Sequence, residues 1–273
     1  MDLLGELPSE ARRRGRTAEF ERYLAWLDGM GVNTLLWVPE PAKGGEPRPW
    51  LESRPLAAIL PNLPLYARDV MDRGPAGAVL KRLLALSPFK FPSLAGASLG
   101  WTPGLLSRSF AQGIMLLVEL EYQGISRLDV REAVLHSSAV DMALAFGAKE
   151  LFPLFERWAE RRGLKPVFLT YNLGLLTSSV DRWGFDPRGL AFPVNEKRYH
   201  VRAASDGTWL RWSGRSTAWE VDAGGTVPLE QALESLREQG LGRALVPYGS
   251  FEPASTKERL TAFKDRLARD LKP

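Results

Sequence analysis

The chain contains no cysteine and only two histidines among its 273 residues. Without a thiol it cannot form disulfides, thiolate metal sites, iron–sulfur clusters or a cysteine nucleophile. No apolar run reaches the roughly 20 residues of a transmembrane helix, and residues 1–10 lack the charged start and apolar stretch of a signal peptide. The sequence therefore predicts a cytoplasmic protein that is not inserted in a membrane.

The charge is nearly balanced, with 36 basic and 32 acidic residues. This small excess gives no indication of a nucleic-acid partner. The densest basic cluster is formed by Arg12, Arg13, Arg14 and Arg16, without interleaved aromatic residues, so we expect residues 1–16 to be a flexible or loosely packed N-terminal arm. The preference for arginine, the 20 prolines and the missing cysteine fit a heat-adapted source.

Short β-rich runs recur along the chain, and helical stretches separate most of them. The runs cover residues 33–40, 56–62, 93–99, 113–122, 132–137, 166–172, 189–195 and 243–249. The helices are expected at residues 17–30, 65–86, 102–112, 139–148, 153–162, 173–183, 228–239 and 255–271.

Alternating strands and helices predict a parallel sheet, because parallel strands need crossover connections. Eight such units match a single-domain α/β (β/α)8 TIM barrel over residues 1–273, with residues 201–227 as a β-hairpin insertion after the seventh strand. The alternative is a doubly wound sheet like that of the α/β-hydrolases. No linker divides the chain into two domains.

In a (β/α)8 barrel the active site lies at the carboxyl ends of the strands. Period two along residues 113–122 places Glu119 and Glu121 on one face, so both carboxylates are expected to point into the barrel near its mouth. Burial and mutual repulsion would raise one pKa and supply a proton donor near neutral pH. This hypothesis predicts that glutamine at either position abolishes turnover, whereas the alternative is that Glu121 is solvated and Glu119 pairs with an arginine.

His136 follows the next apolar run and is a candidate base or metal ligand, although a lone histidine is more often a core residue. Together with Glu119 and Glu121 it could hold magnesium, manganese or zinc, but no ligand-spacing motif supports such a site. No organic cofactor is expected. Other polar and aromatic residues at strand ends are candidates for substrate binding: Glu40, Asn62, Trp101, Tyr171, Asn172, Asn195 and Tyr248.

A helix that runs into GVNTLLWVP at residues 31–39, with a glutamate at the end of the fourth run, resembles the (β/α)8-barrel glycoside hydrolases. In that group the acid is the glutamate of the fourth strand, and the nucleophile ends the seventh. The resemblance implies that Glu119 or Glu121 is the acid, that Glu196 is the nucleophile, and that the ligand is a carbohydrate. The distance between the two carboxylates would then decide between retention and inversion.

A competing motif is GASLG at residues 96–100, a G-x-S-x-G pattern between a β-like run and a helix. In an α/β-hydrolase Ser98 would be the nucleophile, with Asp181 and His200 as triad partners. The favoured function is thus carboxylate acid/base chemistry on a small polar ligand. The alternatives are a serine hydrolase, a divalent-metal-dependent lyase and a non-catalytic binding barrel, and a homo-oligomer is compatible with each.

Overall fold

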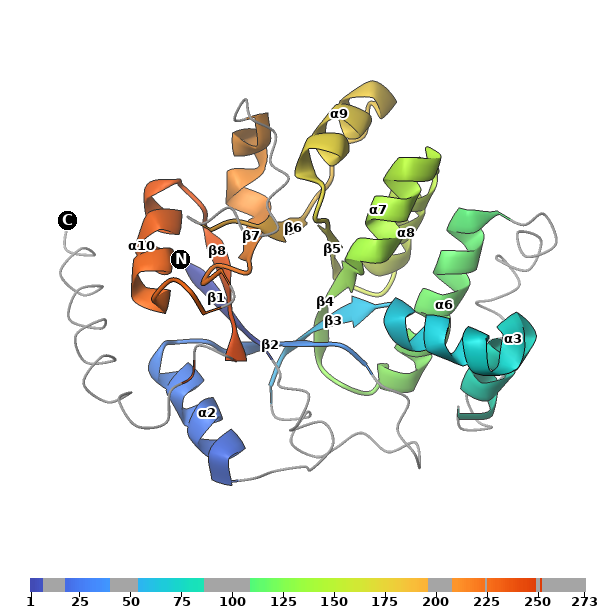
Figure 1. Cartoon of the computed structure of the whole chain (residues 1–273), viewed down its shortest axis with the longest axis horizontal. Helices are drawn as coiled ribbons and strands as arrows, with labels where there is room; N and C mark the ends of the chain where they lie inside the picture. The colour runs from blue at the N-terminus through green and yellow to red at the C-terminus, as the bar shows by residue number, and fades with distance from the viewer. Residues whose placement is uncertain are drawn as a thin grey trace.

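The structure is a computed structural model of the whole chain, and it describes residues 1–6, 18–39, 54–85, 109–195, 208–223, 225–248 and 251. Eight parallel strands form a closed barrel in the order β1-β2-β3-β4-β5-β6-β7-β8 (Figure 1). Their bounds are β1 Asp2–Glu6, β2 Thr34–Trp37, β3 Leu56–Leu60, β4 Val130–Leu135, β5 Lys165–Leu169, β6 Leu190–Pro193, β7 Ser216–Trp219 and β8 Arg243–Val246. The predicted (β/α)8 barrel is confirmed.

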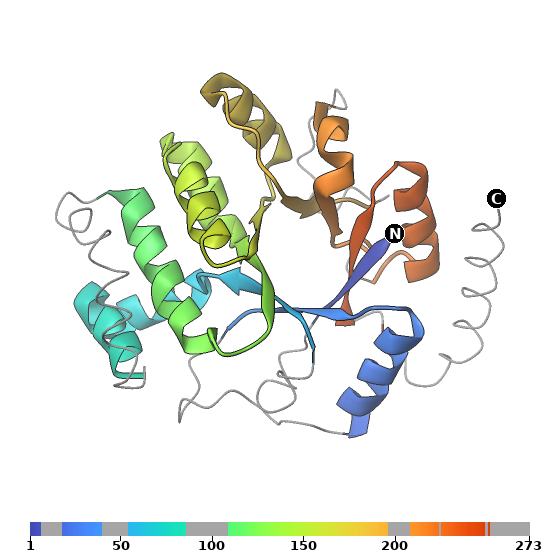
Figure 2. The same cartoon turned by 180° about the vertical axis from the view of Figure 1, so that it is seen from behind.

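Helices surround the barrel, as Figures 1 and 2 show from opposite sides. Their bounds are α2 Ala18–Gly29, α3 Leu63–Ala85, α6 Phe110–Ile125, α7 Ser137–Phe146, α8 Leu151–Glu160, α9 Leu173–Trp183 and α10 Leu229–Glu238, with the 3-10 helix η3 at Thr208–Arg215. The two helices α7 and α8 both lie between β4 and β5 in the chain.

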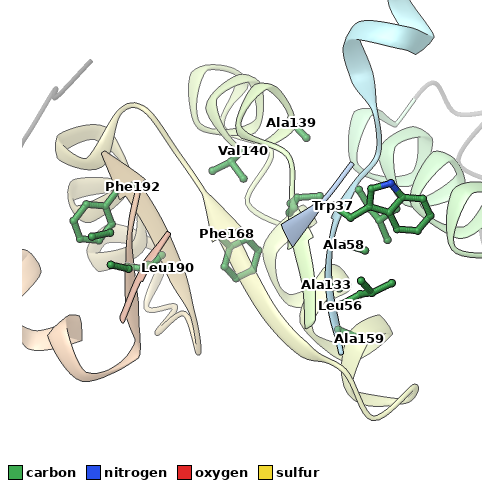
Figure 3. Close-up of a cluster of buried hydrophobic side chains, with 14 of the residues drawn as sticks. Trp37, Leu56, Ala58, Ala133, Ala139, Val140, Ala159, Phe168, Leu190 and Phe192 are labelled. Carbon is green, nitrogen blue, oxygen red and sulfur yellow. The ribbon is translucent and has the colours of Figure 1, made fainter. Parts of the chain in front are cut away.

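Side chains of each strand alternate between two apolar clusters, as the pleat of a strand requires. The larger cluster lies between the strands and the helices, and Figure 3 shows part of it, including Leu56, Ala133 and Phe168. The smaller cluster fills the barrel. Its buried members are Leu4, Leu36, Ala57, Ile59, Val134, Val167, Leu169, Ala191 and Leu245. This alternation identifies the strand residues that point toward the barrel axis.

The amino-terminal end of the barrel interior is closed by an ion cluster. Arg243 of β8 contacts Glu132 of β4 at 2.6 Å and Asp2 of β1 at 2.9 Å. Arg243 and Glu132 are both buried, so their charges are compensated mainly by each other. This ion cluster occupies the floor of the barrel, so the carboxyl ends of the strands remain as the candidate site.

The run at residues 113–122 is not a strand but the centre of α6, which corrects the sequence-based prediction. Residues 114–121 are all buried, because α6 packs against both β3 and α8. A continuous apolar run of this kind does not distinguish a buried strand from a helix that is covered on most sides. The run at residues 93–99 lies outside the described residues.

Two strands that the sequence did not suggest complete the barrel. Asp2–Glu6 was expected to belong to an arm, but it is β1 and pairs with both β2 and β8. Ser216–Trp219 was expected to belong to a β-hairpin insertion, but it is β7 and pairs in parallel with β6 and β8. Both segments are short, so the neighbouring strands that supply their hydrogen bonds decide their conformation. Residues 7–16 lie outside the described part of the chain.

Candidate active site at the carboxyl ends of the strands

Polar and aromatic side chains end five strands at the barrel mouth. Four of them lie an even number of residues beyond a member of the interior cluster, and Trp219 packs against that cluster, so these five continue the inward alternation of their strands. Glu220 follows Trp219 and does not share this alternation, but its carboxylate contacts the inward-facing Tyr171. We call this set the mouth site: Glu6 at the end of β1, His136 after β4, Tyr171 after β5, Asn195 after β6, and Trp219 and Glu220 at the end of β7.

Hydrogen bonds join the ends of β5, β6 and β7. The hydroxyl of Tyr171 donates to Oε1 of Glu220 at 3.1 Å, and Nδ2 of Asn195 donates to the backbone oxygen of Glu220 at 3.2 Å. Burial, together with the neighbouring Glu220 carboxylate, raises the pKa of Tyr171, so its hydroxyl stays protonated as a donor. The indole of Trp219 is next to the same tyrosine and partly offsets the increase in its pKa.

Glu220 adopts a left-handed backbone conformation, with φ of 49°. This region is unfavourable for a residue that carries a Cβ atom, by roughly 1–2 kcal/mol. Such conformations persist where the surrounding structure holds them, and they occur often at functional sites. The backbone bond from Asn195 and the side-chain bond from Tyr171 are two of the contacts that hold Glu220 in place.

His136 extends the ladder of β4, since its backbone N–H donates to Leu60 at 2.9 Å, and it also caps the amino terminus of α7. Its Nδ1 accepts a hydrogen bond from the backbone N–H of Ser138 at 3.1 Å. Burial lowers the pKa of the imidazole below its ordinary value of 6.5. The ring is therefore neutral at physiological pH.

A partly buried network supports the turn that carries Tyr171. Asp141 of α7 accepts hydrogen bonds from the Thr170 hydroxyl at 2.5 Å and from the backbone N–H of Tyr171 at 3.3 Å. Thr170 is fully buried and in turn accepts from the backbone N–H of Asn172 at 2.9 Å. Because His136 caps the same helix, α7 fixes the ends of β4 and β5 relative to each other.

Glu6 is the described carboxylate at the end of β1. Its Oε2 accepts from the backbone N–H of Tyr248 at 3.0 Å, and its backbone oxygen accepts from the Tyr23 hydroxyl at 2.6 Å. The first bond joins the ends of β1 and β8, and the second joins β1 to α2. Glu6 thus lies at the mouth and also stabilises the site at which the barrel closes.

Glu119 does not reach the barrel mouth, which corrects the prediction that its carboxylate points into the barrel. Its carboxylate is fully buried between α6 and α8, where it accepts from Nε1 of Trp158 at 2.7 Å and from Nη2 of Arg162 at 2.5 Å. Nε2 of Gln123 donates to its other oxygen at 2.7 Å. The arginine pairing was the alternative interpretation of this residue, and it is confirmed.

Glu121 also projects from α6 and is not on a strand. Its Oε2 accepts from the backbone N–H of Asn62 at 2.7 Å, so it anchors the turn after β3 and is buried rather than solvated. Asn62 itself caps α3 through a 3.2 Å bond from the backbone N–H of Leu65, and it donates to the backbone oxygen of Pro39 at 3.1 Å. Both residues stabilise the rim of the barrel.

Two further candidates for substrate binding also have structural contacts. Asn172 caps α9 by accepting from the backbone N–H of Leu175 at 3.3 Å. The ring of Tyr248 packs edge-to-face against Tyr23 of α2, with 4.8 Å between ring centroids, on the outer side of the barrel. Among the predicted residues, the structure therefore brings His136, Tyr171 and Asn195 to the mouth.

The remaining predicted residues lie outside the described part of the chain: Glu40, Ser98, Trp101, Glu196 and His200. Glu196 follows β6, so it does not occupy the end of the seventh strand as expected. The closed barrel contradicts the doubly wound sheet on which the serine-hydrolase interpretation of Ser98 depended. Asp181, its proposed partner, forms an ion pair with Arg211.

Sequence reasoning missed Glu6, Asp141 and Glu220 as candidate residues. The signal for Glu6 and Glu220 was the same one that identified the others, a polar residue that ends a short apolar run, in DLLGE and STAWE. Both runs had been assigned to other structures. Asp141 is on a helix, and its contact with Thr170 is visible only in three dimensions.

Among the described residues, no group of three or more histidine, aspartate or glutamate side chains is arranged to hold a metal ion. No helix in the described ranges is long and apolar enough to cross a membrane. Comparison of the chain with protein-family models, with curated proteins and with solved structures found no match.

Proposed function

We propose that the protein is an enzyme that carries out acid/base chemistry on a small polar ligand at the barrel mouth. The observation that carries the proposal is the joining of three strand ends around Glu220, a carboxylate in a strained left-handed backbone conformation. Glu220 would act as the base. Tyr171 would keep its carboxylate oriented, because the tyrosine hydroxyl donates a hydrogen bond to Oε1 of Glu220.

The substrate class that fits these residues is small and hydroxylated. Trp219 is half-buried at the mouth and offers an aromatic face, and Asn195 supplies an amide at the same rim. Flat aromatic surfaces bind the apolar faces of sugars, whereas amides bind hydroxyl groups. A carbohydrate or a related polyol therefore remains the proposed ligand.

The resemblance to glycoside hydrolases is only partly compatible with this arrangement. The seventh strand does end in a glutamate, Glu220, but the fourth ends in His136 instead of a carboxylic acid. We therefore propose the broader acid/base class. The cytoplasmic location, the heat-adapted source, a divalent metal and a homo-oligomer stay predictions from the sequence.

The test compares Glu220→Gln, Glu220→Gly and Asp181→Asn in binding and turnover of a panel of monosaccharides, polyols and methyl glycosides. Asp181→Asn is the control, because that exposed carboxylate is part of a surface ion pair. We expect Glu220→Gln to lose turnover by about 10²–10⁴-fold. Glu220→Gly relieves the backbone strain, so it should lose turnover while remaining at least as stable as the wild type. Full turnover in both Glu220 variants would refute the proposal.

A further inference from the structure

His136 is the one imidazole among the described residues, and its tautomer is fixed by the backbone. A nitrogen that accepts a hydrogen bond carries a lone pair, so the bond from Ser138 to Nδ1 places the ring proton on Nε2. The position of His136 at the amino terminus of α7 also disfavours a positive charge, because the helix dipole is positive there. The residue is therefore a neutral N–H donor whose side chain follows the inward alternation of β4.

A neutral imidazole donor is suited to one kind of chemistry. It is too weak an acid to protonate the leaving oxygen of a glycoside, and its two nitrogens are not free for a metal while Nδ1 accepts and Nε2 carries the proton. It can, however, stabilise negative charge that develops on an oxygen atom, without giving up its proton. Neutral histidines at helix amino termini are known to polarise substrate carbonyl groups in this way.

The geometry points to a small hydroxy-aldehyde or hydroxy-ketone as the substrate, with its carbonyl oxygen bound by Nε2–H of His136 and its neighbouring carbon presented to Glu220. This inference rests on the proposed function and specifies its substrate class. β4 and β7 are separated by β5 and β6 around the ring, so the ligand would span the mouth between them. Tyr171 and Asn195 lie along the strand ends between these two groups.

The step is a proton transfer that needs no oxidant or reductant. The Glu220 carboxylate takes the proton from the carbon next to the carbonyl, and the electron pair of that C–H bond forms a C=C bond. The carbonyl π electrons move onto oxygen, where the hydrogen bond from His136 stabilises the enolate. Glu220 then returns the proton to the same carbon, which regenerates the carboxylate and the starting compound. If the proton is instead returned to the former carbonyl carbon, the proton of the neighbouring hydroxyl group moves to the enolate oxygen and a new C=O bond forms at the other carbon, which gives the isomer.

The first experiment determines the tautomer by long-range ¹H–¹⁵N NMR of the free protein at pH 7. The chain has two histidines, so His136→Gln assigns the signals. We expect the Nε2–H form at His136 in the wild type. Ser138→Pro should remove the preference, because proline lacks the donating N–H and is tolerated in the first turn of a helix. A charged ring, or the Nδ1–H form in the wild type, would overturn the inference.

The second experiment follows loss of the C–H signal of dihydroxyacetone and erythrulose in D₂O, with methyl glucoside as a ligand that has no carbonyl group. We expect exchange above background in the wild type and in Asp181→Asn. The rate should fall about 10²–10⁴-fold in Glu220→Gln and about 10²–10³-fold in His136→Gln.

The outcomes of this exchange experiment separate the two proposals. No exchange with either carbonyl compound overturns the inferred substrate class. If turnover of another polyol or glycoside still depends on Glu220, the proposed acid/base function stands without the inferred carbonyl substrate. If neither exchange nor any Glu220-dependent turnover is found, both fail. Exchange that is unaffected in His136→Gln would remove the histidine from the inferred step.

Discussion

Replacing Glu119 by glutamine tests the structural role of this residue against the catalytic role that the sequence suggested. The carboxylate is fully buried, and donors from Trp158, Gln123 and Arg162 surround it. Glutamine has nearly the same volume, but its amide group replaces one acceptor with two donors. The substitution therefore leaves Arg162 without its counter-charge and brings donors together at the interface of α6 and α8.

Removing one partner of a buried ion pair costs roughly 3–5 kcal/mol of stability. The Arg162 side chain is 21 % exposed, so water partly compensates its charge, and we expect about 3 kcal/mol. Because domains are stable by about 5–15 kcal/mol, Glu119→Gln should remain folded at 25 °C. Its melting temperature should fall by roughly 6–12 °C, at about 2–4 °C per kcal/mol for a chain of this size class.

The assay is urea unfolding followed by tryptophan fluorescence, with the free energy taken from the midpoint and the slope m. Glu150→Gln is the matched control, since Glu150 is exposed and makes no capping bond with its side chain, and its effect should stay within about 0.5 kcal/mol. The folded fraction of Glu119→Gln should keep any turnover that depends on Glu220. Wild-type stability of Glu119→Gln, or loss of turnover in its folded fraction, would refute the reasoning.

Three further predictions concern the barrel floor, the sheet and the pH dependence. Arg243→Met should lower the free energy of unfolding by about 3–5 kcal/mol, because it leaves the Glu132 carboxylate buried without its partner, and the double variant with Glu132→Leu should regain most of this loss in urea unfolding. Gly189→Ala should destabilise the protein by about 1–3 kcal/mol, since the new Cβ would lie 2.5 Å from a carbonyl oxygen of β5. Gly113→Ala has open space on α6 and should stabilise the protein by up to about 1 kcal/mol, so equal effects of the two substitutions would contradict this prediction. Burial lowers the pKa of His136 in the folded state, so below pH 6.5 the unfolded chain binds more protons and the free energy of unfolding should decrease as the pH is lowered. The stability difference between wild type and His136→Gln, measured from pH 7 to pH 5, should show this slope, and a flat difference would refute it.

The fold could be predicted from the sequence because alternation of strands and helices is a local property. The runs at residues 56–62, 132–137 and 166–172 are apolar, bounded and separated by helical segments, and each forms a strand close to its predicted limits. The polar residues that end these runs include His136 and Tyr171, and both lie at the mouth. Composition alone excluded every thiol-dependent chemistry.

Tertiary structure decided the residues whose conformation depends on their neighbours. The run that carries Glu119 and Glu121 is a helix that packs against β3 and α8. A continuous apolar sequence does not indicate which elements will pack against it, so it does not distinguish this helix from a buried strand. The four residues of β7 become a strand because β6 and β8 supply hydrogen bonds on both edges. That pairing carries Glu220 to the mouth beside Tyr171, a contact between residues 49 positions apart that no local pattern specifies.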